Sequence, residues 1–386
     1  VTGVQTCPLP ISRPRLGAGF DLPVIYAGNR AVRGDVRAIL EGRVALQFVD
    51  NLRPTLETEH LAPARDAIHD VFMEHVMAQA PGYGKLMSWA DAPIMPTPGA
   101  MGLIIAALAE RDQVNVVGVD IGGATTDVFS VFDGVFNRTV SANLGMSYSV
   151  SNVLAEAGLA SIQRWVPFPL DAAELRDRIG GKMIRPTTIP ETLEELKIEQ
   201  AIAREALRLS FVQHRTFAVK LHGAQQARSI ADAFAQGGSD SLVDLMKLDL
   251  LVGSGGVLSH APRRAQSMLM MIDAFLVEGV TEIAVDSIFM MPHLGVLSTI
   301  HPDAATEVFE KDCLVRLGTC VATVGAPAAG PALTVELRLP DGATKRLTLA
   351  AGALELVPLA DGAYAEATLT PAKGVDVGAG PGERPW

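Results

Sequence analysis

The stretch that most constrains the fold of this chain is residues 114–132, which read VNVVGVDIGGATTDVFSVF. The β-branched run that opens it predicts a buried strand, and Asp120 closes that strand. Gly122 and Gly123 then turn the chain, and Thr125–Phe132 predicts a second strand running back. The pattern therefore predicts a β-hairpin with two glycines at its turn and an acidic residue at the entrance of the turn.

The residue types at this turn are suited to binding phosphate. Glycines let backbone N–H groups approach a ligand, and successive N–H groups form a concave anion site. We predict that Asp120 is catalytic and holds Mg²⁺ through water, while hydroxyl groups donate to phosphate oxygens. The nucleotide-binding candidates here are Gly122, Gly123, Thr125, Thr126 and Asp127. An ordinary Gly-Gly hairpin is the alternative, but the D-x-G-G-x-T-T-D string is more specific than that dipeptide.

A second glycine-rich turn lies in Leu248–His260, LDLLVGSGGVLSH. A predicted buried strand runs into the turn, and a helix is predicted over Pro262–Glu278. Such a turn brings backbone N–H groups onto a nucleotide, although many α/β turns are glycine-rich for packing alone. The nucleotide-binding candidates here are Gly253, Ser254, Gly255 and Gly256.

Helices are predicted on either side of the hairpin. Pro98–Arg111 is rich in glycine and alanine, with Thr97 as its N-cap, and is either a hinge element or a packing helix. Other predicted helices are Ala62–Ala80, Asp171–Ile179 (ended by Gly180 and Gly181) and Pro190–His214. After a small-residue linker, Thr334–Leu339, Arg346–Leu349, Leu354–Leu359 and Tyr364–Leu369 predict a small all-β module.

Composition excludes several classes of protein. With 48% hydrophobic and 19% charged residues, the chain is globular. A net charge of −11 argues against nucleic acid, and the longest apolar runs are too short to span a membrane. Three cysteines fit a reduced, cytoplasmic protein without a disulfide framework. The first residues, Val1–Ser12 with Cys7, resemble a translated sequencing-library adapter, and we predict that they are an artefact.

The ordered motifs resemble those of the actin-like ATPases and, more closely, those of the MutL/GlmL family over roughly Leu22–Gly382. Beside the two glycine-rich turns, the resemblance is carried by PVIYAGNRAV (Pro23–Val32), IMPTP (Ile94–Pro98), FNRTVSANLGMSYSV (Phe136–Val150) and DVGAGPG (Asp376–Gly382). It implies an α/β, actin-like (ribonuclease H-like) fold, ATP and Mg²⁺ as cofactors, and a partner. The implied partner is the adenosylcobalamin-dependent glutamate (methylaspartate) mutase, for which the family is an accessory, reactivating chaperone.

The resemblance also sets the expected domains. Residues 20–112 are the remainder of a first actin-like half with its hinge helix, and 113–325 are a second half with a helical insertion at 146–247. Residues 332–386 are the β-rich module. The family's own first phosphate loop, D-F-G-S/T, does not occur in the sequence. We therefore expect this chain alone to be a fragment that binds ATP weakly at best, hydrolyses it at background rate and associates with itself.

Three functions follow from these observations. An ATP-driven factor that reactivates a glutamate mutase or a related aminomutase is favoured. An ATP-dependent enzyme of the hydantoinase/oxoprolinase type, whose phosphate loop is similar, is the first alternative, and a structural, filament-forming actin relative is the second. Copurification with a mutase, ATP-coupled amide hydrolysis and sedimentable polymers distinguish the three.

Overall fold

A computed structural model describes residues 22–55, 58, 60–90, 94–219 and 241–383. The predicted artefact, Val1–Ser12, lies outside the described residues. The described residues divide into two compact units, one formed by those up to Ile94 and the other by those from Met95 on. In the described part of the chain, no helix combines the length and the apolar character that crossing a membrane requires.

The N-terminal unit contains a small parallel sheet. β1 (Pro23–Tyr26) pairs in parallel with β2 (Ala45–Phe48), and the crossover that a parallel pair requires is formed by η2 (Arg30–Val32) and α1 (Arg33–Leu40). The remaining helical segments of this unit are α2 (Ala62–Phe72), η3 (Met73–Met77) and α3 (Tyr83–Met87). The helix predicted over Ala62–Ala80 is thus present as α2 and η3, with π-type hydrogen bonding in its second part.

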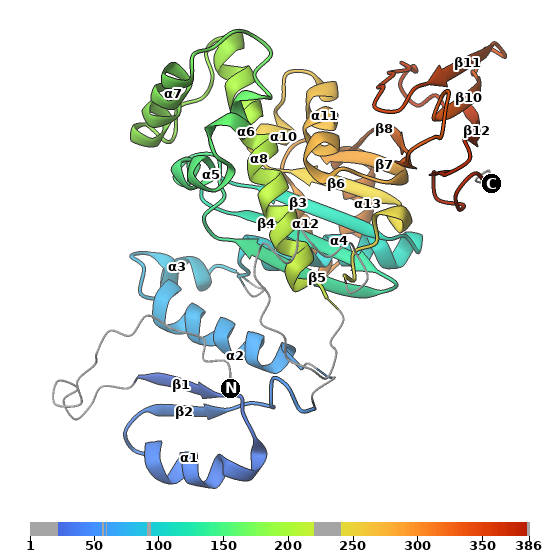
Figure 1. Cartoon of the computed structure of the whole chain (residues 1–386). Helices are drawn as coiled ribbons and strands as arrows, with labels where there is room; N and C mark the ends of the chain where they lie inside the picture. The colour runs from blue at the N-terminus through green and yellow to red at the C-terminus, as the bar shows by residue number, and fades with distance from the viewer. Residues whose placement is uncertain (1–21, 56–57, 59, 91–93, 220–240, 384–386) are drawn as a thin grey trace. The chain divides into compact units, whose positions relative to one another are not determined.

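The second unit is built on a six-stranded sheet with the order β5-β4-β3-β6-β7-β8 (Figure 1). Its strands are β3 (Val116–Ile121), β4 (Thr126–Phe132), β5 (Val135–Ser141), β6 (Leu250–Ser254), β7 (Gly279–Asp286) and β8 (Leu314–Ala322). β3, β4 and β5 form an antiparallel meander, β6 and β7 run parallel to β3, and β8 is antiparallel. This topology confirms the predicted actin-like fold class.

Helices cover both faces of the sheet, because the central strands are buried on both sides. One face packs against α8 (Leu193–Phe217), α10 (Gly256–Ser259) and α11 (Arg264–Phe275). On the outer side, α5 (Val150–Ala157) and α6 (Leu159–Gln163) pack against α8, and α7 (Ala172–Ile184) packs against α5 and α6. The other packs against α4 (Thr97–Asp112), α12 (Met291–Ser298), α13 (Pro302–Val308) and η5 (Phe309–Cys313). Figure 1 shows α8 and α4 on opposite sides of the strands. A short 3₁₀ turn, η4 (Leu245–Lys247), leads into β6.

Helix α8 joins the sheet through a buried histidine. His214 is fully buried, and its ring nitrogens lie 3.0 Å from Thr139 Oγ1 on β5 and 2.8 Å from Ser130 Oγ on β4. Burial lowers the pKa of His214 to about 4, so the ring is neutral at pH 7. At its other end, α8 begins with a capping box between Thr192 and Glu195. The histidine thus holds α8 against β4 and β5, while the capping box satisfies backbone N–H groups at the start of the helix.

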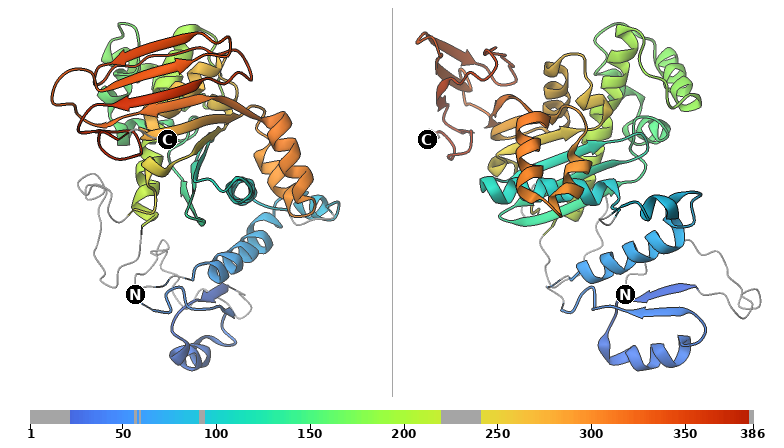
Figure 2. Two further views of the ribbon diagram at one scale, coloured as in Figure 1. Left: turned by 90° about the vertical axis from the view of Figure 1, so that its right-hand side faces the viewer. Right: turned by 180° about the vertical axis from the view of Figure 1, so that it is seen from behind.

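The C-terminal module is a three-stranded antiparallel sheet, seen face-on in the left panel of Figure 2. Its strands are β10 (Leu333–Arg338), β11 (Thr344–Leu349) and β12 (Glu366–Pro371), while β9 (Val324–Gly325) pairs with β13 (Val375–Asp376). The predicted all-β module is therefore present. The strand predicted over Leu354–Leu359 is wrong: this segment forms no strand, and Leu354 and Leu356 are exposed.

Other predicted boundaries also need correction. Thr97 is the first residue of α4 rather than its N-cap, which is Pro96. Helix α7 runs through Gly180 and Gly181 and ends at Ile184, since glycine lowers helix stability without forbidding the helical conformation. The region predicted as one helix over Pro262–Glu278 contains α11, and the shorter α10 precedes it. Neither α12 nor β8 was predicted.

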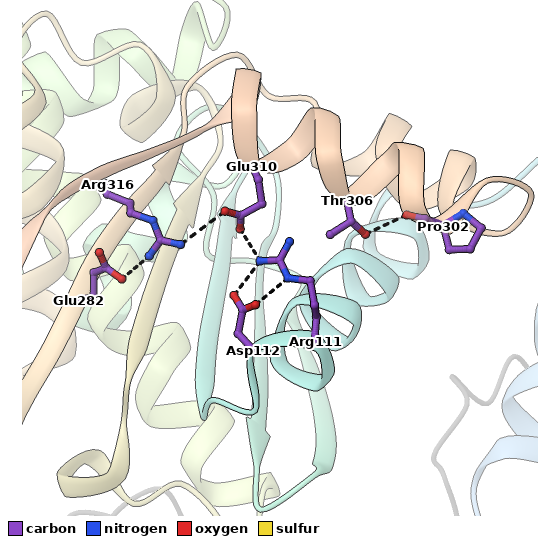
Figure 3. Close-up of polar contacts among 7 residues, drawn as sticks. All are labelled: Arg111, Asp112, Glu282, Pro302, Thr306, Glu310 and Arg316. Atoms are coloured by element: carbon purple, nitrogen blue, oxygen red, sulfur yellow. Dashed lines mark hydrogen bonds and ion pairs between the residues drawn. The ribbon is translucent and has the colours of Figure 1, made fainter. Parts of the chain in front are cut away.

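A chain of ion pairs joins the C-terminal end of α4 to the sheet (Figure 3). Arg111 Nε lies 2.6 Å from Asp112 Oδ1, and Arg111 Nη2 lies 2.8 Å from Glu310 Oε1. Glu310 also contacts Arg316 of β8 at 3.5 Å, and Arg316 pairs with Glu282 of β7. These half-exposed pairs contribute little stability individually, but together they hold one end of α4 in place.

Candidate functional site

Four polar side chains form a row across neighbouring strands, close to the carboxyl ends of β3, β6 and β7. Asp127 on β4 lies opposite Asp120 on β3, and Asp120 lies opposite Ser254 on β6. The hydroxyl of Ser254 donates a hydrogen bond of 3.4 Å to Asp286 Oδ2, at the end of β7. All four residues are buried, with at most 6% exposed surface. We call Asp127, Asp120, Ser254 and Asp286 the polar row.

The polar row is on the face that α4 and α12 cover. On its own strand, each row member is two or four residues away from an apolar residue that packs on that face. These apolar residues are Val116 on β3, Phe129 on β4, Val252 on β6 and Ala284 on β7. Because strand side chains alternate between faces, the row projects to the same side as these apolar residues. The strands thus place apolar side chains under the helices and polar ones at the carboxyl edge, where open α/β sheets bind ligands.

The carboxyl groups of the row are strongly perturbed. Burial, together with the negative charges of Asp127 and Asp286, raises the pKa of Asp120 to about 7. Burial also raises the pKa of Asp127 to about 6, against the opposing effects of Arg138 and of a hydrogen bond from Thr125. At neutral pH these buried acids are therefore partly protonated, since their ionised forms are not fully compensated by positive charge.

Two oxygens of the row have no hydrogen-bond partner among the described residues. They are Asp120 Oδ1 and Asp127 Oδ1, and both are inaccessible to solvent. A buried, unpaired carboxylate oxygen is costly, and a bound cation would compensate it. The described part of the chain contains no group of three His, Cys, Asp or Glu side chains able to enclose a metal ion directly. The oxygen donors present fit a hydrated Mg²⁺ held through water, as predicted for Asp120.

Residues 144–149 pack against the hairpin turn and donate hydrogen bonds to its backbone carbonyl groups. The carbonyl of Gly122 accepts from Met146 N at 2.9 Å, and that of Gly123 accepts from Ser147 N at 2.8 Å. The carbonyl of Ala124 accepts from the hydroxyl of Ser149 at 2.7 Å. With the carbonyls engaged, the N–H groups of Gly123 and Ala124 donate no hydrogen bond within the described residues. Two successive free N–H groups at an exposed turn are what an anion site requires.

Gly145 is a residue of this site that the sequence analysis did not select. A Cβ on Gly145 would lie 2.5 Å from the carbonyl carbon of Ala124 and 2.6 Å from its nitrogen. The segment after β5 therefore lies directly against the turn, and only glycine permits that approach. Nothing near Gly145 in the sequence indicates its contact with a turn formed some twenty residues earlier.

The two predicted threonines differ in their surroundings. Thr125 is half-buried, and its hydroxyl lies 3.5 Å from Asp127 Oδ2. Thr126 is fully buried, and its hydroxyl donates to the carbonyl of Leu144 at 2.5 Å. The hydroxyl of Thr126 thus holds the segment behind the turn. A contact of either hydroxyl with phosphate stays a prediction.

The turn after β6 lies beside the end of β3. A Cβ on Gly255 would lie 2.2 Å from the carbonyl oxygen of Ile121, and Gly255 has a φ of +98°. Gly253 is buried, and a Cβ there would meet Met271 Sδ at 2.5 Å. Gly256 is exposed, with no atom within 4 Å of the Cβ position. The structure therefore brings the two predicted glycine-rich turns together at one edge of the sheet.

Asp286 is the other residue that the sequence analysis missed. It is the last residue of a buried strand, as Asp120 is the last but one of β3, and this position was the available signal. No glycine-rich turn follows it, so nothing linked it to phosphate chemistry. Asp286 Oδ2 accepts a 2.9 Å hydrogen bond from Met291 N, at the start of α12.

The second unit thus has an actin-like fold, with the polar row beside two glycine-rich turns. Sequence comparison is more specific. The family described as "MutL protein" matches residues 13–313. Protein MutL of Clostridium tetanomorphum is 27% identical over 335 residues, which cover 80% of this chain and 70% of that protein. The chain therefore belongs to the MutL family.

Two solved structures share part of the arrangement. Component A of the (R)-2-hydroxyglutaryl-CoA dehydratase of Acidaminococcus fermentans is 16% identical, with a TM-score of 0.29, and the match covers 66% of this chain and 86% of that one. The activator of the 2-hydroxyisocaproyl-CoA dehydratase from Clostridium difficile, with bound ADPNP, is 14% identical, with a TM-score of 0.28, covering 66% and 85%. At these scores, nothing about the chemistry of this chain follows from either structure.

Proposed function

We propose that this chain binds ATP with Mg²⁺ at Asp120 and Asp127 of the polar row and at the two adjoining turns. The observation that carries the proposal is that, among the described residues, carboxylate oxygens and backbone N–H groups without partners lie side by side at the carboxyl ends of the strands. Asp120 and Asp127 present buried carboxylate oxygens without partners, and beside them Gly123 and Ala124 present free N–H groups. A magnesium-bound polyphosphate supplies a cation for the first pair and anionic oxygens for the second.

Each residue of the site then has a defined task. Asp120 and Asp127 hold the cation through water, and Asp120 also orients the water that attacks the terminal phosphate. The N–H groups of Gly123 and Ala124 donate to phosphate oxygens, and the exposed backbone at Gly256 leaves room for the nucleotide. Mg²⁺ supplies charge neutralisation at the phosphate oxygens when it is bound.

The biological role that we propose is that of an ATP-driven accessory protein. Its client would be an adenosylcobalamin-dependent glutamate (methylaspartate) mutase or a related aminomutase, which it reactivates by helping the damaged cofactor to exchange. Membership of the MutL family and the actin-like sheet support an accessory role that is driven by nucleotide. The identity of the client rests on the family resemblance.

The first test compares two isosteric substitutions at opposite ends of one hairpin. Asp120→Asn should remove the enhancement of ADP binding by Mg²⁺, about tenfold by calorimetry, because the row loses one of its carboxylates. In a version of the chain to which the family's first phosphate loop has been added, the substitution should lower the rate of ATP hydrolysis about 10²-fold. The matched control is Asp133→Asn, which removes an exposed carboxylate at the distal turn.

The same Mg²⁺ enhancement of ADP binding in Asp120→Asn and in Asp133→Asn would remove Asp120 from the proposed site.

The client is tested by a separate binding experiment. The purified mutase subunits should be retained by this protein in a nucleotide-dependent manner. Retention that is indifferent to ADP and ATP would contradict an ATP-driven reactivating role.

A further inference from the structure

Asp286 joins the polar row to a helix. Its side chain is fully buried, and Oδ2 accepts hydrogen bonds from Ser254 Oγ at 3.4 Å and from Met291 N at 2.9 Å. The other oxygen, Oδ1, accepts from Ile288 N at 3.4 Å. Asp286 therefore has one partner in the row and two in the backbone that leads into α12.

Helix α12 is in direct backbone contact with α4. A Cβ on Gly295 would lie 1.9 Å from the carbonyl oxygen of Ala100, so no other residue fits there without moving a helix. At its far end, α4 is held to β7 and β8 by the ion pairs of Figure 3. The contact of α12 with α4 therefore lies in the N-terminal half of α4, where Ala100 is, and away from its anchored end.

We propose that Asp286 is a positioning residue that couples nucleotide occupancy of the polar row to the contact between α12 and α4. The inference rests on the proposed function, because that function supplies the ligand. In the free protein, Asp286 and Asp120 are buried acids that repel each other. A cation beside Asp120 changes the field at Asp286, and hence the strength with which Asp286 holds Ser254 and the first turn of α12.

Asp286 is distinguished from the other row members by what it contacts. Asp120 and Asp127 each have an oxygen without a hydrogen-bond partner among the described residues, as a group directed at a ligand would. Both oxygens of Asp286 are already engaged within the protein. This places Asp286 behind the site, where it acts through Ser254 and α12.

The test is hydrogen–deuterium exchange with Mg²⁺ and ADP as the probe. In the wild-type protein, Mg·ADP should slow amide exchange in residues 287–298 about tenfold. Asp286→Asn should bind Mg·ADP within about threefold of wild type by calorimetry, yet lose this protection. The neutral amide has one acceptor oxygen for the two N–H groups of Ile288 and Met291, and it has no charge that responds to the cation. The matched control is Asp249→Asn. Asp249 Oδ2 also accepts a backbone N–H, that of Asn115 at 2.8 Å, but it precedes β6 at the opposite end of the strand.

The outcomes separate the two proposals. Equal protection of residues 287–298 in wild type and Asp286→Asn overturns the coupling role, as does equal loss in the Asp249→Asn control. Absence of Mg·ADP binding by the wild-type protein overturns the proposed function, and this inference with it. Should Asp286→Asn fail to fold, Ser254→Ala removes the row contact of the same carboxylate and should reduce the protection at least threefold when Mg·ADP is saturating for the variant by calorimetry. Unchanged protection in Ser254→Ala would then overturn the coupling.

Discussion

The turn between β3 and β4 and the turn after β6 lie side by side, but added side chains would meet different surroundings in the two. At the hairpin turn, a Cβ on Gly123 would meet Ser147 at 3.3 Å, a contact that small shifts relieve. At the second turn, a Cβ on Gly255 would meet backbone at 2.2 Å, whereas one on Gly256 would meet nothing. Glycines with the same sequence signature thus serve two purposes, close packing at Gly255 and open access at Gly256.

The two turns also differ in charge. The hairpin turn is flanked by Asp120 and Asp127, both buried acids with raised pKa values. The turn after β6 contributes the neutral Ser254 and backbone alone. The hairpin therefore supplies the chemistry of the proposed site, and the second turn supplies its shape. Three substitutions or conditions test this division.

The largest effect is expected from Gly255→Ala. Its φ of +98° and ψ of 156° are accessible almost only to glycine, and the added Cβ would collide with the carbonyl of Ile121. We expect the free energy of unfolding to fall by about 3 kcal/mol or more in urea denaturation. Gly256→Ala is the control and should change it by less than about 1 kcal/mol. Comparable losses in the two variants would contradict the packing role of Gly255.

An intermediate effect is expected from pH in the ligand-free protein. The folded-state pKa values of Asp120 and Asp127, about 7 and about 6, exceed the ordinary value of 3.8. The folded state therefore binds more protons than the unfolded state in this range, and stability is lost as pH rises from about 5 to about 8. We expect a loss on the order of 2 kcal/mol, measured as a falling melting temperature.

Asp120→Asn separates this effect from the titration of other groups. The variant cannot ionise at position 120, so its melting temperature should depend less on pH over the same interval. A pH dependence identical to that of wild type would show that the hairpin acids are not the source. Mg²⁺ should oppose the loss at high pH in wild type, because a cation stabilises the ionised carboxylates.

The smallest effect on stability is expected from Gly256→Val. This substitution should instead lower the affinity for ADP. The Cβ position is open, so the free energy of unfolding should change by less than about 1 kcal/mol. The added methyl groups would obstruct backbone approach to the nucleotide, and ADP affinity should fall about tenfold by calorimetry. Normal affinity would limit the second turn to packing.

Much of the fold could be predicted because it depends on local patterns. The alternation and turn residues of 114–132 place both hairpin strands within two residues of their observed ends. Helix α12 was missed because it is only eight residues long and begins next to Pro292, so its sequence shows little helical periodicity. Strand β8 was missed because its half-buried pattern is weak, and only its pairing with β7 makes it a strand.

The site was predictable to the extent that its residues are neighbours in sequence. Asp120 and Asp127 belong to one hairpin, and their pairing follows from the turn. Gly145 and Asp286 were missed because their contacts with that hairpin depend on how distant segments pack. The sequence also gives no means of separating Gly255 from Gly256, since the distinction is the proximity of Ile121.

The parallel pairing of β3 with β6 also constrains how this protein acquires its native state. Val116 pairs with Leu250, so the chain between them must be closed into a loop of more than a hundred residues before the strands can meet. Closing such a loop costs entropy, and contacts so distant in sequence form slowly. The meander β3–β4–β5 needs no such closure and can bring Asp120 and Asp127 together early. We therefore expect the polar row, and with it the proposed nucleotide site, to be completed late in folding.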